Sequence, residues 1–191
     1  MPDLKDELHG KLQQSREHLL AKLVGLDEYD LRRPMTATGT NLLGLVKHLT
    51  GVEYGYLGSA FDRPPHRPLP WVADGSIWEG ADMWATADES STELIEGYRR
   101  ACAHGDRTIA ELDLDAPGHV AHWPEDRRAT TLGVLLVRMV AETAHHAGHA
   151  DIVRELIDGT AGADHDALTD EEWRAYVATV QAAADRHRPT A

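Results

Sequence analysis

Apolar residues recur at the spacing of an α-helix in five segments of the chain, and stretches rich in proline and glycine separate these segments. The predicted helices span about residues 4–26, 40–61, 90–112, 130–159 and 169–185. Capping residues support these boundaries. Thr40 is expected to cap the second helix, Ser90 with Glu93 the third, Thr130 or Thr131 the fourth and Thr169 with Glu172 the fifth, and Gly159 is expected to end the fourth in a left-handed turn.

The segments between the helices predict the fold class. Two long irregular connections cover residues 62–88 and 113–129, and no segment shows a convincing strand-like alternation. Four long helices with long crossover connections predict an all-α four-helix bundle with an extra C-terminal helix. We expect one domain over residues 1–191, with the bundle in 1–160, the C-terminal helix in 161–185 and a frayed tail in 186–191.

Composition narrows the class of partner. The formal net charge is −13, from 19 basic and 32 acidic residues, which disfavours nonspecific binding to nucleic acid or to anionic membranes. The single cysteine, Cys102, excludes an intramolecular disulfide and a cysteine-cluster metal site. No signal peptide and no run of about 18 apolar residues is evident, so we expect a soluble cytoplasmic protein.

Polar residues interrupt the apolar face of the fourth predicted helix. At ~100° per residue, the face contains Leu135, Met139, Ile152, Val153 and Leu156, together with Arg138, Glu142, His145 and His149. Burying four polar groups is costly unless they are paired or bind a ligand. The arrangement therefore points to a buried functional site.

His145 and His149 are four residues apart, so both imidazoles can reach one metal ion. A third ligand has to come from another helix, and His48 is the best candidate because Gly44, Gly51 and Gly55 leave room on its side of the second helix. Three histidines leave a metal with an open position, as in catalytic zinc sites. Glu142 would then be a base, an outer-sphere acceptor or a fourth ligand.

Other interpretations of these histidines stay open. Each one is also compatible with a core or surface histidine that hydrogen bonds to neighbouring groups. His146 points about 100° away from His145, which favours a solvent or packing role, although a rotated helix would let it replace His145. His119 and His122 lie in the second connection, where a solvated loop is the simpler interpretation.

Two segments resemble a known family. Residues 39–49, GTNLLGLVKHL, resemble the second-helix motif of the DinB-like superfamily, and residues 142–159, ETAHHAGHADIVRELIDG, resemble its metal-binding helix. The most similar branch is that of the actinobacterial mini-circle proteins, whose function is unassigned. The resemblance covers nearly the whole chain.

The resemblance implies an up-down-down-up bundle, often dimeric, with a divalent zinc or nickel ion held by His48, His145 and His149. Relatives of known activity include mycothiol-dependent maleylpyruvate isomerases and transferases of mycothiol or bacillithiol. The isomerase has a glutamate where this chain has His145, which leaves the isomerase reaction itself in question.

The preferred prediction is a metal-dependent transferase or isomerase that activates a low-molecular-weight thiol such as mycothiol, with an electrophilic small molecule as its second substrate. Glu142 would orient a ligand or carry a proton, and Arg138 would contact a negative group of the substrate or pair with Glu142. One alternative is a metal-dependent hydrolase that uses metal-bound water. Another is a non-catalytic protein that binds a metal or a small molecule, and a homodimer through the last helix is compatible with each.

Overall fold

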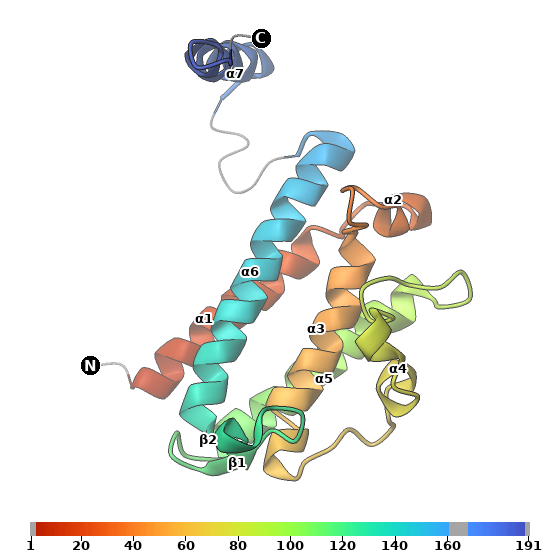
Figure 1. Ribbon diagram of the computed structural model, residues 1–191, viewed down its shortest axis with the longest axis vertical. Helices are drawn as coiled ribbons and strands as arrows, with labels where there is room; N and C mark the ends of the chain where they lie inside the picture. Colours follow the sequence, from red (N-terminus) through yellow and green to blue (C-terminus); the bar gives the residue numbers. More distant parts are fainter. Residues whose placement is uncertain (1–2, 161–167, 190–191) are drawn as a thin grey trace.

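Four long helices form the body of the protein in a computed structural model that describes residues 3–160 and 168–189. They are α1 (Leu4–Ala21), α3 (Leu42–Tyr56), α5 (Ser91–Glu111) and α6 (Leu132–Asp158). Helix α1 packs along α6, α3 packs along α5, and α3 also contacts α6 (Figure 1). The predicted all-α bundle is confirmed, and its directions follow the up-down-down-up order (Figure 1).

Short elements fill the connections. The first connection carries α2 (Glu28–Arg32), and the second carries η1 (Ser59–Phe61), α4 (Pro70–Ala73) and η2 (Ser76–Glu79). Between α5 and α6 the chain forms β1 (Pro117–His119), η3 (Glu125–Arg127) and β2 (Ala129–Thr131). The strands pair antiparallel, so the prediction of no strand was wrong for this three-residue ladder, which is too short to produce a visible alternation.

Most of the predicted helix ends are confirmed. The hydroxyl of Ser90 accepts a hydrogen bond from the Glu93 backbone N–H at the start of α5. Helix α6 ends at Gly159, whose φ of 75° lies in the left-handed region. Helix α7 (Asp170–Asp185) begins with a complete capping box between Thr169 and Glu172.

Three predicted ends were wrong by one to five residues. Helix α3 ends at Tyr56 instead of residue 61, and the short η1 follows it. Asn41, not Thr40, caps α3, because its side-chain oxygen accepts a 2.7 Å hydrogen bond from the Gly44 backbone N–H. Helix α1 ends at Ala21 instead of residue 26, and the chain turns through Gly25 at a φ of 79°.

The rotation of α6 differs from the sequence prediction. Its buried face is formed by Leu132, Leu135, Leu136, Met139, Thr143, Ala147, Ala150 and Val153. Ile152 and Leu156, which were predicted in the core, are 59% and 56% exposed. The central part of the buried face consists of small residues, which let α6 approach its neighbours closely. Large apolar side chains therefore do not identify the buried face of this helix.

A buried ion pair joins α1 to α3 in the middle of the bundle. The Arg16 guanidinium donates two hydrogen bonds of 2.7 Å to the Glu53 carboxylate, and Glu53 is fully buried. Burial raises the pKa of Glu53, whereas the pKa of Arg16 lies above its ordinary value because the effect of Glu53 outweighs that of burial. The two short bonds favour the ionised pair. Arg16 also donates a 2.6 Å hydrogen bond to Asp106 of α5, so one side chain connects three helices.

A second polar contact predicts how stability depends on pH. Asp151 of α6 lies 2.8 Å from both His18 and Lys22, at the end of α1. Burial opposes the ionisation of Asp151, but its hydrogen bonds to Lys22 and His18 outweigh burial and lower its pKa. A carboxyl group with a lowered folded-state pKa stabilises the fold above its unfolded-state pKa, and this contribution disappears as pH falls through the folded-state value.

We therefore expect Asp151→Asn to lower the free energy of unfolding at pH 7 by no more than about 1 kcal/mol. The difference between the wild type and the variant should begin to decrease near the unfolded-state pKa of about 4 and should vanish below the lowered folded-state pKa. Urea denaturation at several pH values measures both quantities. A difference that stays constant down to pH 2 would contradict the assignment.

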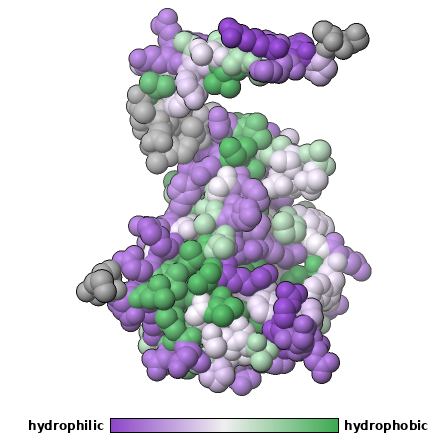
Figure 2. Space-filling view, turned by 60° about the vertical axis from the view of Figure 1, so that its left-hand side comes forward, coloured by the Kyte–Doolittle hydropathy of each residue, from purple (hydrophilic) through white to green (hydrophobic). Residues whose placement is uncertain are grey.

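Helix α7 has no buried residue and lies beyond the end of α6 in Figure 1. Tyr176, Val177 and Val180 are each more than half exposed, and Figure 2 shows hydrophobic groups on the lower side of this helix and hydrophilic ones above. Of the predicted C-terminal segment 161–185 and tail 186–191, residues 161–167 and 190–191 lie outside the described part. No described helix is long and apolar enough to cross a membrane.

Candidate metal centre

Three side chains from two helices converge beside the core. His48 comes from α3, and Glu142 and His146 come from consecutive turns of α6. One potential ligand atom from each residue lies within 4.8 Å of the other two, and within residues 3–160 and 168–189 this is the one such group found. All three side chains are partly buried, so a ligand could reach them from solvent.

The distances in this group suit a small cation. The Glu142 Oε1 atom lies 3.4 Å from the His48 Nε2 atom and 3.4 Å from the His146 Nε2 atom. A tetrahedral ion with metal–ligand bonds of ~2.0–2.1 Å holds its ligand atoms ~3.3–3.4 Å apart. Two imidazoles and one carboxylate therefore have the composition and spacing of a zinc-type site. Three protein ligands would leave at least one position for another molecule.

Asp82 orients His48. This aspartate, 5% exposed, lies in the connection after η2, and its Oδ2 atom is 2.7 Å from the His48 Nδ1 atom. If the Nδ1–H group of a neutral His48 donates to Asp82, its Nε2 atom carries a lone pair that points toward Glu142. The Glu142 carboxylate is also a hydrogen-bond acceptor. Two facing acceptors repel unless a cation or a proton lies between them. The carboxylate–histidine contact is the outer-sphere arrangement common at metal sites.

A glycine lets the connection that carries Asp82 approach α3. A Cβ atom placed on Gly44 would lie 1.9 Å from the Met83 carbonyl oxygen, so a side chain at this position would push the backbone of Met83 away. Gly44 was predicted to leave space on the His48 side of the helix. The backbone of Met83 occupies this space. The glycine thus positions Asp82 beside His48.

Electrostatics favour the ligand-competent forms of both α6 residues. Burial alone would raise the pKa of Glu142, but the hydrogen bond to His48 and the charge of His146 outweigh it and lower that pKa. Burial and the charge of His48 lower the pKa of His146. The carboxylate and the neutral imidazole, which are the forms that bind metal, are therefore favoured near neutral pH.

His145 and His149, the other two predicted ligands, lie outside this group. Both are exposed, and their rings stack on each other with centroids 5.5 Å apart. His149 remains close to the group, since its Nδ1 atom is 3.4 Å from the Nδ1 atom of His146. The ligand set predicted from the sequence, His48, His145 and His149, stays a prediction. The structure brings His48 together with Glu142 and His146.

Arg138, one turn before Glu142, takes part in an aromatic cluster. Its guanidinium carbon lies 5.0 Å from the ring centroid of Tyr56 and 5.2 Å from that of Trp123. His122 packs against Trp123 and against Trp78, which is 75% exposed. The pKa of His122 is lowered by partial burial and by the charge of Arg138.

This cluster shows which of the loop histidines lies near the site. His122 is exposed, as expected for a loop residue, and its ring centroid lies 6.0–6.5 Å from those of three aromatic side chains. His119 lies in β1 and is exposed. Arg138 of this cluster lies one helical turn along α6 from Glu142. The sequence suggested an ion pair between Arg138 and Glu142, but the two described side chains do not form one.

Comparison with known protein families assigns the chain to a family. A family described as mycothiol-S-transferase matches residues 7–159, which is most of the sequence and includes both helices of the site. The chain belongs to the mycothiol-S-transferase family. This family is DinB-like, so the resemblance noted in the sequence is confirmed.

The chain also has a structural relative. A crystal structure of a conserved protein from Enterococcus faecalis superimposes with a TM-score of 0.62 at 14% identity, and it covers 84% of this chain and 100% of its own. At this identity the similarity concerns the fold alone. No protein with a curated description matches the chain.

Asp82 is the site residue that the sequence analysis missed. It precedes Glu142 by 60 positions and stands in an irregular connection, so no periodicity links it to His48. The nearest signal is the acidic residue itself, placed between the predicted helices and flanked by tryptophans.

Replacing Asp82 with alanine is expected to weaken metal binding by this chain about 10–100-fold, because His48 loses the group that fixes its orientation. Competition with a chromophoric chelator measures this affinity. Asp88→Ala, in the same connection but outside the group, is a suitable control. Equal affinities for the Asp82 variant and the wild type would exclude an orienting role.

Proposed function

We propose that this member of the mycothiol-S-transferase family is a metal-dependent enzyme that transfers a low-molecular-weight thiol, of the mycothiol type, to an electrophilic small molecule. The observation that carries the proposal is the convergence of His48, Glu142 and His146, in which the Glu142 Oε1 atom lies 3.4 Å from the Nε2 atom of each histidine. The family assignment supports the thiol as a substrate.

The donor set fits a divalent ion of the zinc or nickel type. A divalent ion held there would lower the pKa of a thiol, so that thiolate is available at neutral pH. His48, oriented by Asp82, and His146 would hold the ion as neutral imidazoles. Glu142 would be the third ligand, and one carboxylate would leave the centre with a net positive charge that attracts a thiolate.

Two features of the surrounding structure support a second substrate. Gly51 and Gly55 follow His48 along α3 and line a cleft of about 240 Å³ with Val72 and Ala73, and no residue of the metal group lines this cleft. Such a cleft suits the apolar part of a small electrophile. On the α6 side, Arg138 on the rings of Tyr56 and Trp123 presents a positive charge for an anionic group.

The chemical step is a substitution at carbon. The thiol loses its proton to water, its sulfur forms a bond to the electrophilic carbon, and the leaving group departs with the electron pair of the broken bond. Addition without a leaving group is the equivalent step for an unsaturated electrophile.

The test is a screen of metal-loaded protein with low-molecular-weight thiols and a set of alkyl halides and activated alkenes. We expect conjugate formation, measured by mass spectrometry, that requires both the thiol and the metal and is lost in His146→Ala. Hydrolysis of substrates without thiol would favour the hydrolase alternative. Stoichiometric metal with no turnover of any pair would favour a binding protein, and either result would overturn the proposal.

A further inference from the structure

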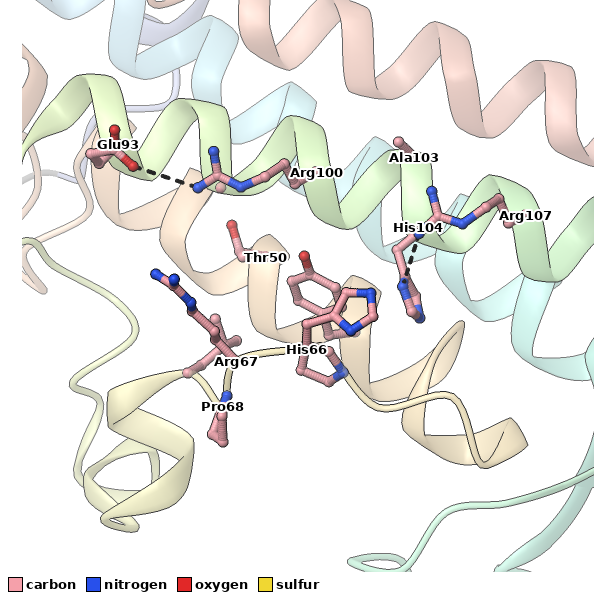
Figure 3. Close-up of a pocket in the computed structure, with 13 residues that line it drawn as sticks. Thr50, His66, Arg67, Pro68, Glu93, Arg100, Ala103, His104 and Arg107 are labelled. Atoms are coloured by element: carbon pink, nitrogen blue, oxygen red, sulfur yellow. Dashed lines mark hydrogen bonds and ion pairs between the residues drawn. The ribbon is translucent and has the colours of Figure 1, made fainter.

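A cavity of about 620 Å³ lies between α5, the C-terminal half of α3 and the proline-rich connection that follows η1. Three arginines line it, namely Arg67 from the connection and Arg100 and Arg107 from α5. His66 and His104 lie beside them, and Glu93 is the one acidic residue in the lining (Figure 3). We call this cavity the arginine pocket.

The charge of the arginine pocket is opposite to that of the whole chain. The protein has a formal net charge of −13, yet the lining of this cavity carries three guanidinium groups against one carboxylate. Glu93 compensates little of this charge, because it lies 3.6 Å from Arg100 and both side chains are largely exposed. Arg67 forms no hydrogen bond or ion pair with the described residues.

Arg67 and Arg100 approach the cavity from different elements, and Arg107 lies farther along α5 beside His104 (Figure 3). Figure 3 shows the guanidinium of Arg67 reaching from the connection toward α5, where Arg100 stands. Arg107 donates a 3.3 Å hydrogen bond to the His104 Nδ1 atom, while the His104 Nε2–H donates to the Arg63 carbonyl oxygen at 2.8 Å. Burial raises the pKa of Tyr54, and the charges of Arg100 and Arg107 oppose that rise, so both act at the same hydroxyl.

The residues of α5 that line the arginine pocket lie on one face of the helix. Glu93, Gly97, Arg100, His104 and Arg107 follow one another at intervals of three or four residues, which places them on one face. A Cβ atom placed on Gly97 would meet nothing closer than an Arg100 nitrogen at 3.8 Å, so the lining has free space at this position. A continuous basic face with a glycine in it is therefore encoded in the helix.

The arginine pocket is separate from the metal centre. Thr50 and Tyr54 of α3 line it, and they lie about 200° and 240° around the helix from His48, at ~100° per residue. The two sites therefore open on different sides of the same helix, and a ligand in one does not need the other.

We propose that the arginine pocket binds a compact multivalent anion, of the phosphate or polycarboxylate class, independently of the metal centre. Arginine forks pair with the oxygens of both classes through two parallel hydrogen bonds. A ligand with two or three negative charges would neutralise the guanidinium groups that Glu93 leaves uncompensated. The cavity volume lies within the range of small-ligand sites.

The test is calorimetric titration of metal-free protein with pyrophosphate and, separately, with tricarballylate, at low ionic strength. We expect saturable binding of at least one anion, and the tighter of the two identifies the class. The double variant Arg67→Gln with Arg100→Gln should weaken binding about tenfold or more, since each loses a charge-assisted contact. Circular dichroism verifies that the variant is folded.

Two controls make the result specific. Arg99→Gln removes a neighbouring exposed charge that pairs with Glu96 and does not line the cavity, so binding should stay within about twofold. His146→Ala should also leave binding unchanged. Absence of binding to both anions at millimolar concentration, equal weakening by Arg99→Gln, or loss of binding in His146→Ala would each overturn the proposal.

Discussion

Replacing His146 with alanine is expected to remove stoichiometric metal from the protein, whereas replacing the adjacent His145 should leave close to one equivalent bound. His146 contributes one of three converging ligand atoms, while His145 lies on the exposed side of α6. Loss of a direct ligand should weaken the affinity by more than about 100-fold, beyond the usual effect of losing an outer-sphere group. Elemental analysis of tag-free protein and competition with a chelator measure content and affinity.

His145→Ala is a matched control, because it removes the same chemical group from the next position of the same helix. A protein that loses metal in His145→Ala and keeps it in His146→Ala would restore the set of three histidines predicted from the sequence. His149→Ala separates the two possibilities further. It should keep the metal if His48, Glu142 and His146 suffice, although its ring nitrogen lies only 3.4 Å from that of His146.

Replacing Arg16 with methionine is expected to lower the free energy of unfolding by about 3–5 kcal/mol, because it leaves the fully buried carboxylate of Glu53 without its partner. Asp106 would lose the same guanidinium, which joins α1 to α5. Urea denaturation followed by circular dichroism measures the change. A loss below about 1 kcal/mol would mean that water or another cation replaces the arginine.

The double variant Arg16→Met with Glu53→Leu tests the cause of this loss. Since both charges are then absent, it should recover much of the stability, as buried ion pairs often do when apolar residues replace both partners. Arg99→Ala provides the surface control. It breaks the exposed pair with Glu96 and should change the free energy of unfolding by less than about 0.5 kcal/mol.

The sequence alone was sufficient for the class of fold and for the helices that carry the site. Helical periodicity and local caps report on neighbouring residues, so the starts of α5 and α7 and the end of α6 at Gly159 could be read directly. His48 on one helix and a cluster of histidines and a glutamate on another were enough to point to a metal. These signals depend on residues that are close to one another in the sequence.

Which of the two adjacent histidines lies beside His48 depended on tertiary structure. The sequence analysis placed the large residues Ile152 and Leu156 inside, but α6 buries Thr143, Ala147 and Ala150 against its neighbours. Close packing of small residues rotates the helix by about one position, ~100°, and brings His146 instead of His145 beside His48. Hydrophobicity along one helix cannot report the shape of the surface that it packs against.

Contacts between distant segments were likewise decided only by the folded chain. Asp82 meets His48 because Gly44 admits the connection after η2, and Arg67 faces α5 because the proline-rich connection folds back over α3. Neither pair has a periodic signal, since irregular segments take their course from the surfaces they cover. The sequence therefore determined the helices and the kind of chemistry, and the packing of those helices decided which side chains meet.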